Sequence, residues 1–316
     1  MTGSLCTDCH TIHNSEGNQP ATFDGSWAPY LALLRGSCEG CHTSTSASVW
    51  QSSIAGAPIV YNSLEPSYGS KGLSGGNFYY TSTASDEHGH NIFSSNPDSS
   101  LGNIPPGGLD IGQQLNCSGT YGCHGHNGRQ SGDTAIDDQL IAVMGGHHGL
   151  SSPMTGSIAE VSKSYRFLLG IKGVEDPDWE HDNVNTSHNE YQGSTAGSTD
   201  TISYLCAECH GNFHTWEGTE VGTASPWLRH PTDVLLPASG EYAAYTNYSL
   251  LSPVARQSPD LVADTTLVNL GSDTIMCLSC HRAHASPYDK MLRWDYKNST
   301  LSTALSGCNV CHTSKD

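Results

Sequence analysis

The chain has 316 residues, of which only 36% are apolar, and it contains 34 glycines and 15 prolines. So few apolar side chains bury too little surface to offset the entropy of ordering the chain, which argues against an ordinary core. The formal net charge of −18 excludes nucleic-acid binding through a basic face, and we find no apolar run long enough to span a membrane.

The twelve cysteines form pairs that recur along the chain. Five pairs read Cys-x-x-Cys-His, with a histidine directly after the second cysteine. Covalent haem attachment needs these three residues, since two thiols reach the two vinyl groups of a porphyrin and the imidazole binds iron. A disulfide framework or a zinc site has no use for a histidine repeated at that place. The five motifs are Cys6, Cys9 and His10; Cys38, Cys41 and His42; Cys206, Cys209 and His210; Cys277, Cys280 and His281; and Cys308, Cys311 and His312.

The remaining two cysteines are Cys117 and Cys123, which are separated by five residues and followed directly by His124. Gly119 and Gly122 would let the extra backbone loop outward. We interpret this segment as a sixth haem c motif with an expanded spacer. The alternative is a small disulfide loop beside an unrelated histidine.

The motifs divide the chain into three parts of a single multihaem unit. Residues 1–45 hold two motifs, residues 271–316 repeat that arrangement, and residues 46–270 hold the other two among long loops. We therefore expect a chain that is mostly coil with short α-helices and very little β-structure. Its organisation should come from a row of stacked haems.

Few other elements are predicted between the motifs. The run 77–81 has strand-like composition, and 137–144 indicates a short helix with an acidic start that ends at Gly145. Residues 164–169 form another short apolar run. At 227–231, a proline holds the preceding His230 in extended backbone and predicts a turn.

Eleven histidines remain beyond the six proximal ones, enough to give every iron a second imidazole. His13 and His284 each lie three residues after a proximal histidine, one turn along a predicted short helix, where each would face a neighbouring haem. We assign His13 to the second iron and His284 to the sixth. The other candidates are His230 for the fifth iron, His90 and His188 for the first and fourth, and one of His148, His147 and His214 for the third. We expect His88, His126 and His181 to be solvated or to bond propionates.

Methionine is the rival axial ligand, but the five methionines stand in no repeated relation to the motifs. Bis-histidine ligation fills both axial positions and favours electron transfer over catalysis, so we expect no enzyme activity. The competing hypothesis is a multihaem reductase with one open iron. High-spin ferric haem would distinguish that reductase.

The opening Cys6-x-x-Cys9-His10-x-x-His13-Asn-Ser and the segment from Cys277 to His284 resemble the multihaem c-type cytochromes of metal-reducing bacteria, especially their outer-surface members. The resemblance implies a hexahaem protein that polymerises into an extracellular filament of stacked haems. It also implies that His13 ligates a haem of the next subunit. The implied partners are other cytochromes, copies of the chain itself, and minerals, electrodes or partner cells as acceptors.

The expected location is extracellular or at the outer cell surface, with the periplasm as the second choice, because haem is attached outside the bacterial cytoplasm. The N-terminus has neither a charged n-region nor an apolar h-region. We therefore expect a signal peptide to have been removed.

Overall fold

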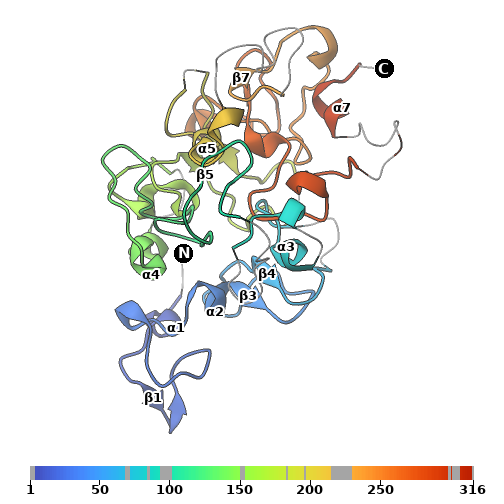
Figure 1. The fold of residues 1–316 in the computed structure, drawn as a ribbon. Helices are drawn as coiled ribbons and strands as arrows, with labels where there is room; N and C mark the ends of the chain where they lie inside the picture. The colour runs from blue at the N-terminus through green and yellow to red at the C-terminus, as the bar shows by residue number, and fades with distance from the viewer. Residues whose placement is uncertain are drawn as a thin grey trace.

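The computed structural model of the chain describes residues 4–67, 72–83, 86–92, 102–149, 154–182, 184–195, 197–214, 230–297, 300 and 307–314. Most of this chain is irregular and winds through turns, as Figure 1 shows. The longest element among these residues, α5, has six residues. The expected fold class, mostly coil with short helices and little β-structure, is confirmed.

The regular elements of the described residues are short. The α-helices are α1 (Cys6–Cys9), α2 (Cys38–His42), α3 (Tyr79–Thr83), α4 (Gln139–Ala142), α5 (Ile202–Ala207) and α7 (Cys308–Cys311). The 3-10 turns are η1 (Leu31–Leu33), η2 (Asp86–His88), η3 (Gly146–His148), η4 (Val161–Lys163), η5 (Tyr165–Phe167), η6 (Gly211–Phe213), η7 (Gly240–Tyr242), η8 (Pro259–Leu261), η9 (Cys277–Ser279) and η10 (Asp289–Met291).

The strands pair only two by two within the described chain. β1 (Ser15–Glu16) pairs antiparallel with β2 (Gln19–Pro20), and β3 (Thr43–Ser44) pairs parallel with β4 (Tyr61–Asn62). β5 (Gly173–Val174) pairs antiparallel with β6 (Glu190–Tyr191), and β7 (Val234–Leu235) with β8 (Thr274–Ile275). These ladders tie loops together and build no continuous sheet. None of the described helices is both long and apolar enough to cross a lipid bilayer.

Side-chain caps start several of these helices. The Ser37 hydroxyl accepts from the N–H of Gly40 at 3.2 Å at the start of α2, and the Asp138 carboxylate accepts from the N–H of Leu140 at 2.9 Å at the start of α4. Such caps satisfy backbone donors that the first helical turn leaves unpaired. The helix expected within 137–144 is confirmed in a shorter form, and Gly145 follows it with a left-handed φ of 80°.

Two local expectations are wrong. The run 77–81 is not a strand, because the Asn77 side chain accepts from the N–H of Tyr79 at 3.0 Å and begins the helix α3. His13 does not lie on a helical continuation of its motif, since α1 ends at Cys9 and His10 is already extended at φ −114° and ψ 152°. His284 likewise lies beyond the end of η9, outside any helix. Most of the turn expected at 227–231 falls outside the described residues.

The apolar core is divided into small clusters. One gathers Met154, Tyr165, Leu168, Ile171, Tyr191, Ile202, Leu205, Ala255, Met276 and Leu278. A second gathers Leu236, Tyr245, Tyr248, Val254, Val268, Ile275 and Cys311. A buried ion group lies close by, where Arg256 donates to Glu190 at 2.9 Å and to Asp273.

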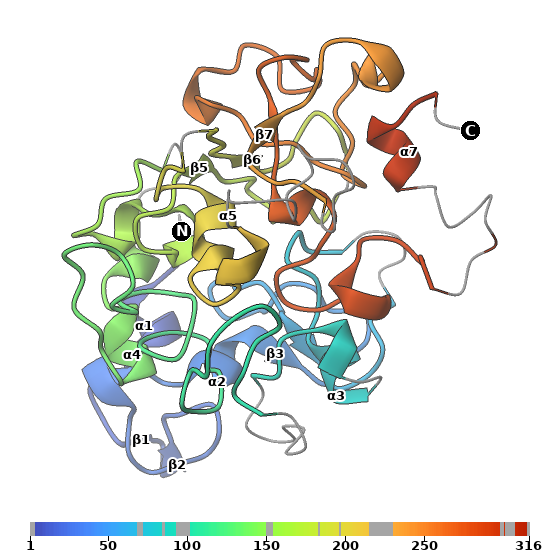
Figure 2. The same cartoon turned by 45° about the horizontal axis from the view of Figure 1, so that its top comes forward.

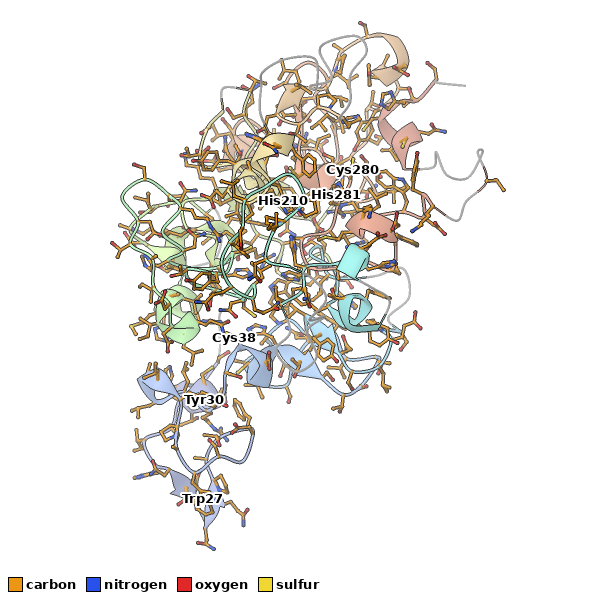
Figure 3. The ribbon with its side chains drawn as sticks, viewed as in Figure 1. Trp27, Tyr30, Cys38, His210, Cys280 and His281 are labelled. Carbon is orange, nitrogen blue, oxygen red and sulfur yellow. The ribbon has the colours of Figure 1, made fainter. Side chains whose placement is uncertain are left out.

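An N-terminal lobe stands at one end of the molecule. α1, β1 and β2 (blue) lie at that end, while α7 (red) lies toward the opposite end, and Figures 1 and 2 agree on this. Trp27 marks the tip of the lobe in Figure 3. Its side chain is exposed, as are those of Leu31 and Leu33.

Candidate haem centres

Four of the five Cys-x-x-Cys-His motifs close with the same backbone hydrogen bond. The N–H of the proximal histidine donates to the carbonyl of the first cysteine; the distances are 2.8 Å for His10, 2.9 Å for His210, 3.1 Å for His281 and 2.9 Å for His312. His42 instead ends α2, which begins at Cys38. Residues three and four apart share one side of a helical turn, so both thiols and the imidazole face the same way. None of the twelve cysteines is joined to another in a disulfide.

The expanded third motif closes with the same bond. The N–H of His124 donates to the carbonyl of Cys117 at 3.1 Å although more residues intervene. Gly119 has a φ of 80°, and a Cβ at Gly122 would lie 2.4 Å from the backbone nitrogen of Ser118. The five residues between the cysteines, three more than in a regular motif, therefore form a tight loop, which glycine permits. Cys117 and His124 therefore have the same backbone hydrogen bond as the first cysteine and the histidine of a regular motif.

A backbone carbonyl orients most of the proximal imidazoles. The Nδ1 atom lies 3.0 Å from the carbonyl oxygen of Ala32 for His10, 2.8 Å from Pro58 for His42, 2.8 Å from Arg166 for His124, 2.7 Å from Pro106 for His210 and 2.8 Å from Lys290 for His281. A carbonyl can only accept, so each Nδ1 carries the proton and the lone pair lies on Nε2. This is the arrangement that metal-bound histidines use. His312 departs from it, because its Nδ1 lies 3.2 Å from a Glu241 carboxylate oxygen without hydrogen-bond alignment.

Five proximal imidazoles face a second imidazole across a constant gap. Metal–imidazole bonds are about 2 Å long and each ring centre lies about 1 Å behind its nitrogen, so two axial imidazoles on one metal place their centres roughly 6 Å apart. The observed centre-to-centre distances are 6.0 Å for His10 and His148, 6.3 Å for His42 and His147, 6.5 Å for His124 and His284, 6.1 Å for His210 and His90, and 6.2 Å for His312 and His230. Every pair therefore has room for one iron.

Burial favours the neutral form of seven of the candidate ligand imidazoles. It lowers the pKa of His147 to about 4 and that of His284 to about 3, with nearby histidines adding to the effect. Burial also lowers the pKa values of His42, His90, His124, His230 and His281. Because a protonated imidazole cannot ligate, these shifts keep the lone pairs available at neutral pH.

His281 is the exception among the proximal histidines. Its Nδ1 is anchored like the others, yet no second imidazole of the described residues faces it at a comparable distance. Figure 3 shows His281 and Cys280 beside His210 in the body of the molecule. His13 lies in the exposed N-terminal lobe, where its backbone bonds Thr11. The expected pairing of His13 with the second iron does not match this arrangement, because His147 occupies that position.

Several other assignments differ from the expectations. His284 faces His124 of the third motif and not the sixth, and His230 faces His312 of the sixth motif and not the fifth. His148, expected as one candidate for the third iron, faces His10 of the first. His90 faces the fourth motif, one of its two expected places. The folded chain brings these histidines together from distant segments. Their spacing in the sequence does not indicate which histidine faces which motif.

Two candidate ligands have other contacts. His188 stacks on Tyr248 at 3.8 Å, and its two ring nitrogens lie 3.0 Å from the carbonyl oxygens of Asn189 and Thr265. His214 places Nε2 2.5 Å from the Asp233 carboxylate. Both rings stabilise the surrounding loops in this structure.

Neighbouring motifs touch one another in chain order. His147 and His148 are adjacent residues that serve the second and first motifs. The Cys38 and Cys117 thiols lie close enough to shift each other's pKa, and so do the thiols of Cys206 and Cys277. The N–H of His90 donates to the carbonyl of His284 at 3.0 Å and so connects the third and fourth pairs. Groups held at these motifs would lie side by side in one row.

Repeated pairs of thiols with oriented imidazoles, in a fold with little regular structure, define the class of this protein: a c-type cytochrome with several covalently bound haems. Electron transfer is the function of this class. The motifs themselves imply haem c as the cofactor.

Comparisons with known proteins agree. A family model described as a doubled CXXCH motif matches residues 271–316. The chain is similar to the C-type cytochrome OmcS of Geobacter sulfurreducens, with 26% identity over 378 aligned positions covering 98% of this chain and 83% of that protein.

Two solved structures share the fold. One is an outer membrane cytochrome S filament from Geobacter sulfurreducens, with a TM-score of 0.56, 20% identity and 98% coverage of each chain. The other is a cryo-EM structure of OmcS nanowires from the same organism, with a TM-score of 0.50, 20% identity and 99% coverage of each chain. The described fold therefore follows that of this outer membrane cytochrome.

Proposed function

We propose that the chain carries six haem c groups and conducts electrons along them without transforming a substrate. The five imidazole pairs at 6.0–6.5 Å carry this proposal, because each joins a proximal histidine to one from a distant loop at the separation that one iron requires. The cysteines of each motif would tether the group, and the carbonyls at Nδ1 would orient its ligand. Bound haem supplies one-electron exchange.

The proposed axial ligands follow the pairs in the structure. They are His10 with His148 for the first haem, His42 with His147 for the second, His124 with His284 for the third, His210 with His90 for the fourth and His312 with His230 for the sixth. Cys117 and Cys123 would hold the third haem, because their motif closes like the others. His188 and His214 are not among the proposed ligands, because their ring nitrogens contact backbone carbonyls and the Asp233 carboxylate.

The axial ligation of the fifth haem distinguishes the two candidate functions. His281 has no internal imidazole partner among the described residues, which favours an open iron and therefore a multihaem reductase as the second candidate. The first candidate closes this position with His13 of another copy of the chain. His13 is exposed and belongs to the N-terminal lobe, which projects from the molecule. A histidine that binds an iron of another copy of the chain has to be accessible in this way.

Exposed apolar side chains around His13 support the second copy as its partner. Leu5, Ile12, Trp27, Leu31 and Leu33 are exposed by 68, 80, 57, 49 and 50% and belong to one lobe. Apolar surface gathered in this way marks an interaction site. A head-to-tail contact of this kind does not close on itself, so it would build a filament. The filament and nanowire assemblies of the similar protein OmcS agree with this proposal.

We propose that such a filament works outside the cell or at its outer surface, with minerals, electrodes, partner cells or other cytochromes as its electron partners. Haem c is attached outside the bacterial cytoplasm, which supports this location. The formal charge of −18 favours a soluble protein whose association is sensitive to ionic strength.

A His13→Ala variant, with His126→Ala as the control, separates the two functions. His126 bonds the Asp133 carboxylate at 2.7 Å and faces no proximal histidine in the described chain. We expect six haems by native mass spectrometry in all proteins, and filaments by electron microscopy in the wild type and the control only. Loss of filaments in His13→Ala should convert one haem from low-spin to high-spin in magnetic resonance spectra. A high-spin haem that persists in assembled wild-type filaments would support the reductase. Fewer than six haems would contradict the proposed count.

A further inference from the structure

Three turns of the chain share an unusual backbone conformation. Each contains two consecutive non-glycine residues with φ between 48° and 62°; the pairs are Ala32 and Leu33, Arg166 and Phe167, and Lys290 and Met291. They lie in η1, η5 and η10 respectively. Side chains rarely adopt this left-handed region, and two adjacent examples are rarer still. A fourth left-handed pair, Trp179 and Glu180 with φ of 59° and 65°, lies elsewhere, and its Trp179 carbonyl accepts from the N–H of Ser74 at 3.0 Å. The three pairs in 3-10 turns share one element type and one cost, which calls for a common purpose.

The three turns make the same two hydrogen bonds. The carbonyl of the first left-handed residue accepts from the Nδ1 of a proximal histidine, at 3.0 Å for His10, 2.8 Å for His124 and 2.8 Å for His281. The carbonyl of the second accepts from the backbone N–H of the residue after that histidine. These distances are 2.9 Å for Thr11, 2.7 Å for Gly125 and 2.9 Å for Arg282.

The left-handed conformation explains how one turn makes both bonds. A helical backbone points neighbouring carbonyls the same way, whereas an extended backbone points them in opposite directions. A left-handed turn keeps the two carbonyls parallel but reverses the direction in which the chain leaves. The turn can then present two adjacent acceptors to one short segment, one to the imidazole and one to the main chain behind it.

The other motifs achieve the first bond differently. His42 and His210 use the carbonyls of Pro58 and Pro106, and His312 has a carboxylate nearby. The left-handed pairs therefore belong to the first, third and fifth motifs, which alternate along the chain.

We propose that these three left-handed pairs are positioning residues that fix the rotation and basicity of the proximal imidazole at the first, third and fifth haems. The inference rests on the proposed function, because it assigns the pairs a role toward the haem ligands. A hydrogen bond held at Nδ1 makes the imidazole a stronger donor to iron and stabilises the oxidised state. Losing the bond should raise the midpoint potential of that haem alone.

The first turn allows the cleanest test, because the Ala32 side chain is small and exposed. Ala32→Val disfavours the left-handed region, since the new side chain is β-branched, whereas Ala32→Gly permits it. Asn18→Val is the matched control, because Asn18 has a φ of 58° in the turn between β1 and β2 and bonds no proximal histidine among the described residues.

Spectroelectrochemical titration and low-temperature magnetic resonance of the purified haem-loaded protein give the readouts. We expect Ala32→Val to raise the potential of one haem and change its g values, while Ala32→Gly and Asn18→Val match the wild type. Identical titrations in all four proteins would overturn the proposal. If Ala32→Val does not accumulate, amide hydrogen exchange in the wild type decides, because rapid exchange at Thr11, Gly125 and Arg282 would overturn it too. Native mass spectrometry of the same samples counts haems, so a failure of the proposed function is recognised separately.

Discussion

The expanded loop of the third motif should not tolerate a methyl group at Gly122. A Cβ there would lie 2.4 Å from Ser118 N, 2.6 Å from Ser118 Cα and 2.7 Å from Cys117 C, all of them backbone atoms that cannot rotate away. Overpacking of this kind costs about 1–3 kcal/mol. For a chain of 316 residues, that corresponds to a fall in the thermal midpoint of about 2–5 °C. Displacing Cys117 should also break the bond to His124 and disturb the spectrum of the third haem.

Gly40→Ala is the matched control for Gly122→Ala, because it also lies between the two cysteines of a motif. A Cβ at Gly40 would meet only the Ser37 hydroxyl at 3.7 Å, an ordinary contact. Alanine in that helical turn should be neutral or slightly stabilising. Thermal unfolding followed at the haem absorption band measures both variants. Equal midpoints and unchanged spectra for Gly122→Ala would refute the tight-loop interpretation.

Three further predictions concern groups outside the haem motifs. Arg256→Met should destabilise the protein by about 3–5 kcal/mol in denaturant unfolding, because it leaves the buried Glu190 and Asp273 carboxylates without their cation. Lys163→Met, which removes the exposed Lys163–Glu160 pair, should leave the midpoint unchanged in the same assay. Burial, and the hydrogen bond that its protonated carboxyl donates to the Asp176 carboxylate, raise the pKa of Asp178 to about 6. Ionising Asp178 therefore costs stability as the pH rises from about 4 through 6, so Asp178→Asn should raise the thermal midpoint more at pH 8 than at pH 4; equal shifts at both pH values would contradict this.

The fold class could be predicted because composition and motif spacing both limit regular structure. Cys-x-x-Cys turns and helix caps such as Asp138 are local signals, and the structure agrees with them. The prediction of a strand at 77–81 was wrong. It rested on the β-propensity of the aromatic run Phe-Tyr-Tyr, but the Asn77 side chain accepts a hydrogen bond from the first residue of a helix there.

The imidazole partners could not be predicted, because their pairing depends on how long loops return. His147 faces the second motif, yet its only sequence signal was its place in the pair with His148. His284 was assigned by helical spacing, but extended backbone after the motif carries it to His124. The left-handed turns at Ala32, Arg166 and Lys290 also went unnoticed, since no glycine marks them.

The long separation between these partners bears on how a chain so poor in apolar residues stays folded. Four of the five imidazole pairs join residues more than 100 positions apart. A covalent cross-link over about 100 residues destabilises the unfolded state by roughly 4–5 kcal/mol, because it lowers the entropy of that state. An iron bound by both histidines would close a loop of similar length while both iron–histidine bonds are intact. Several such closures overlap along this chain, so they can replace the large core that its composition does not supply. By this reasoning the haem ligands stabilise the fold as well as conduct electrons, and the apolar clusters around Tyr191 and Tyr248 complete the interior between them.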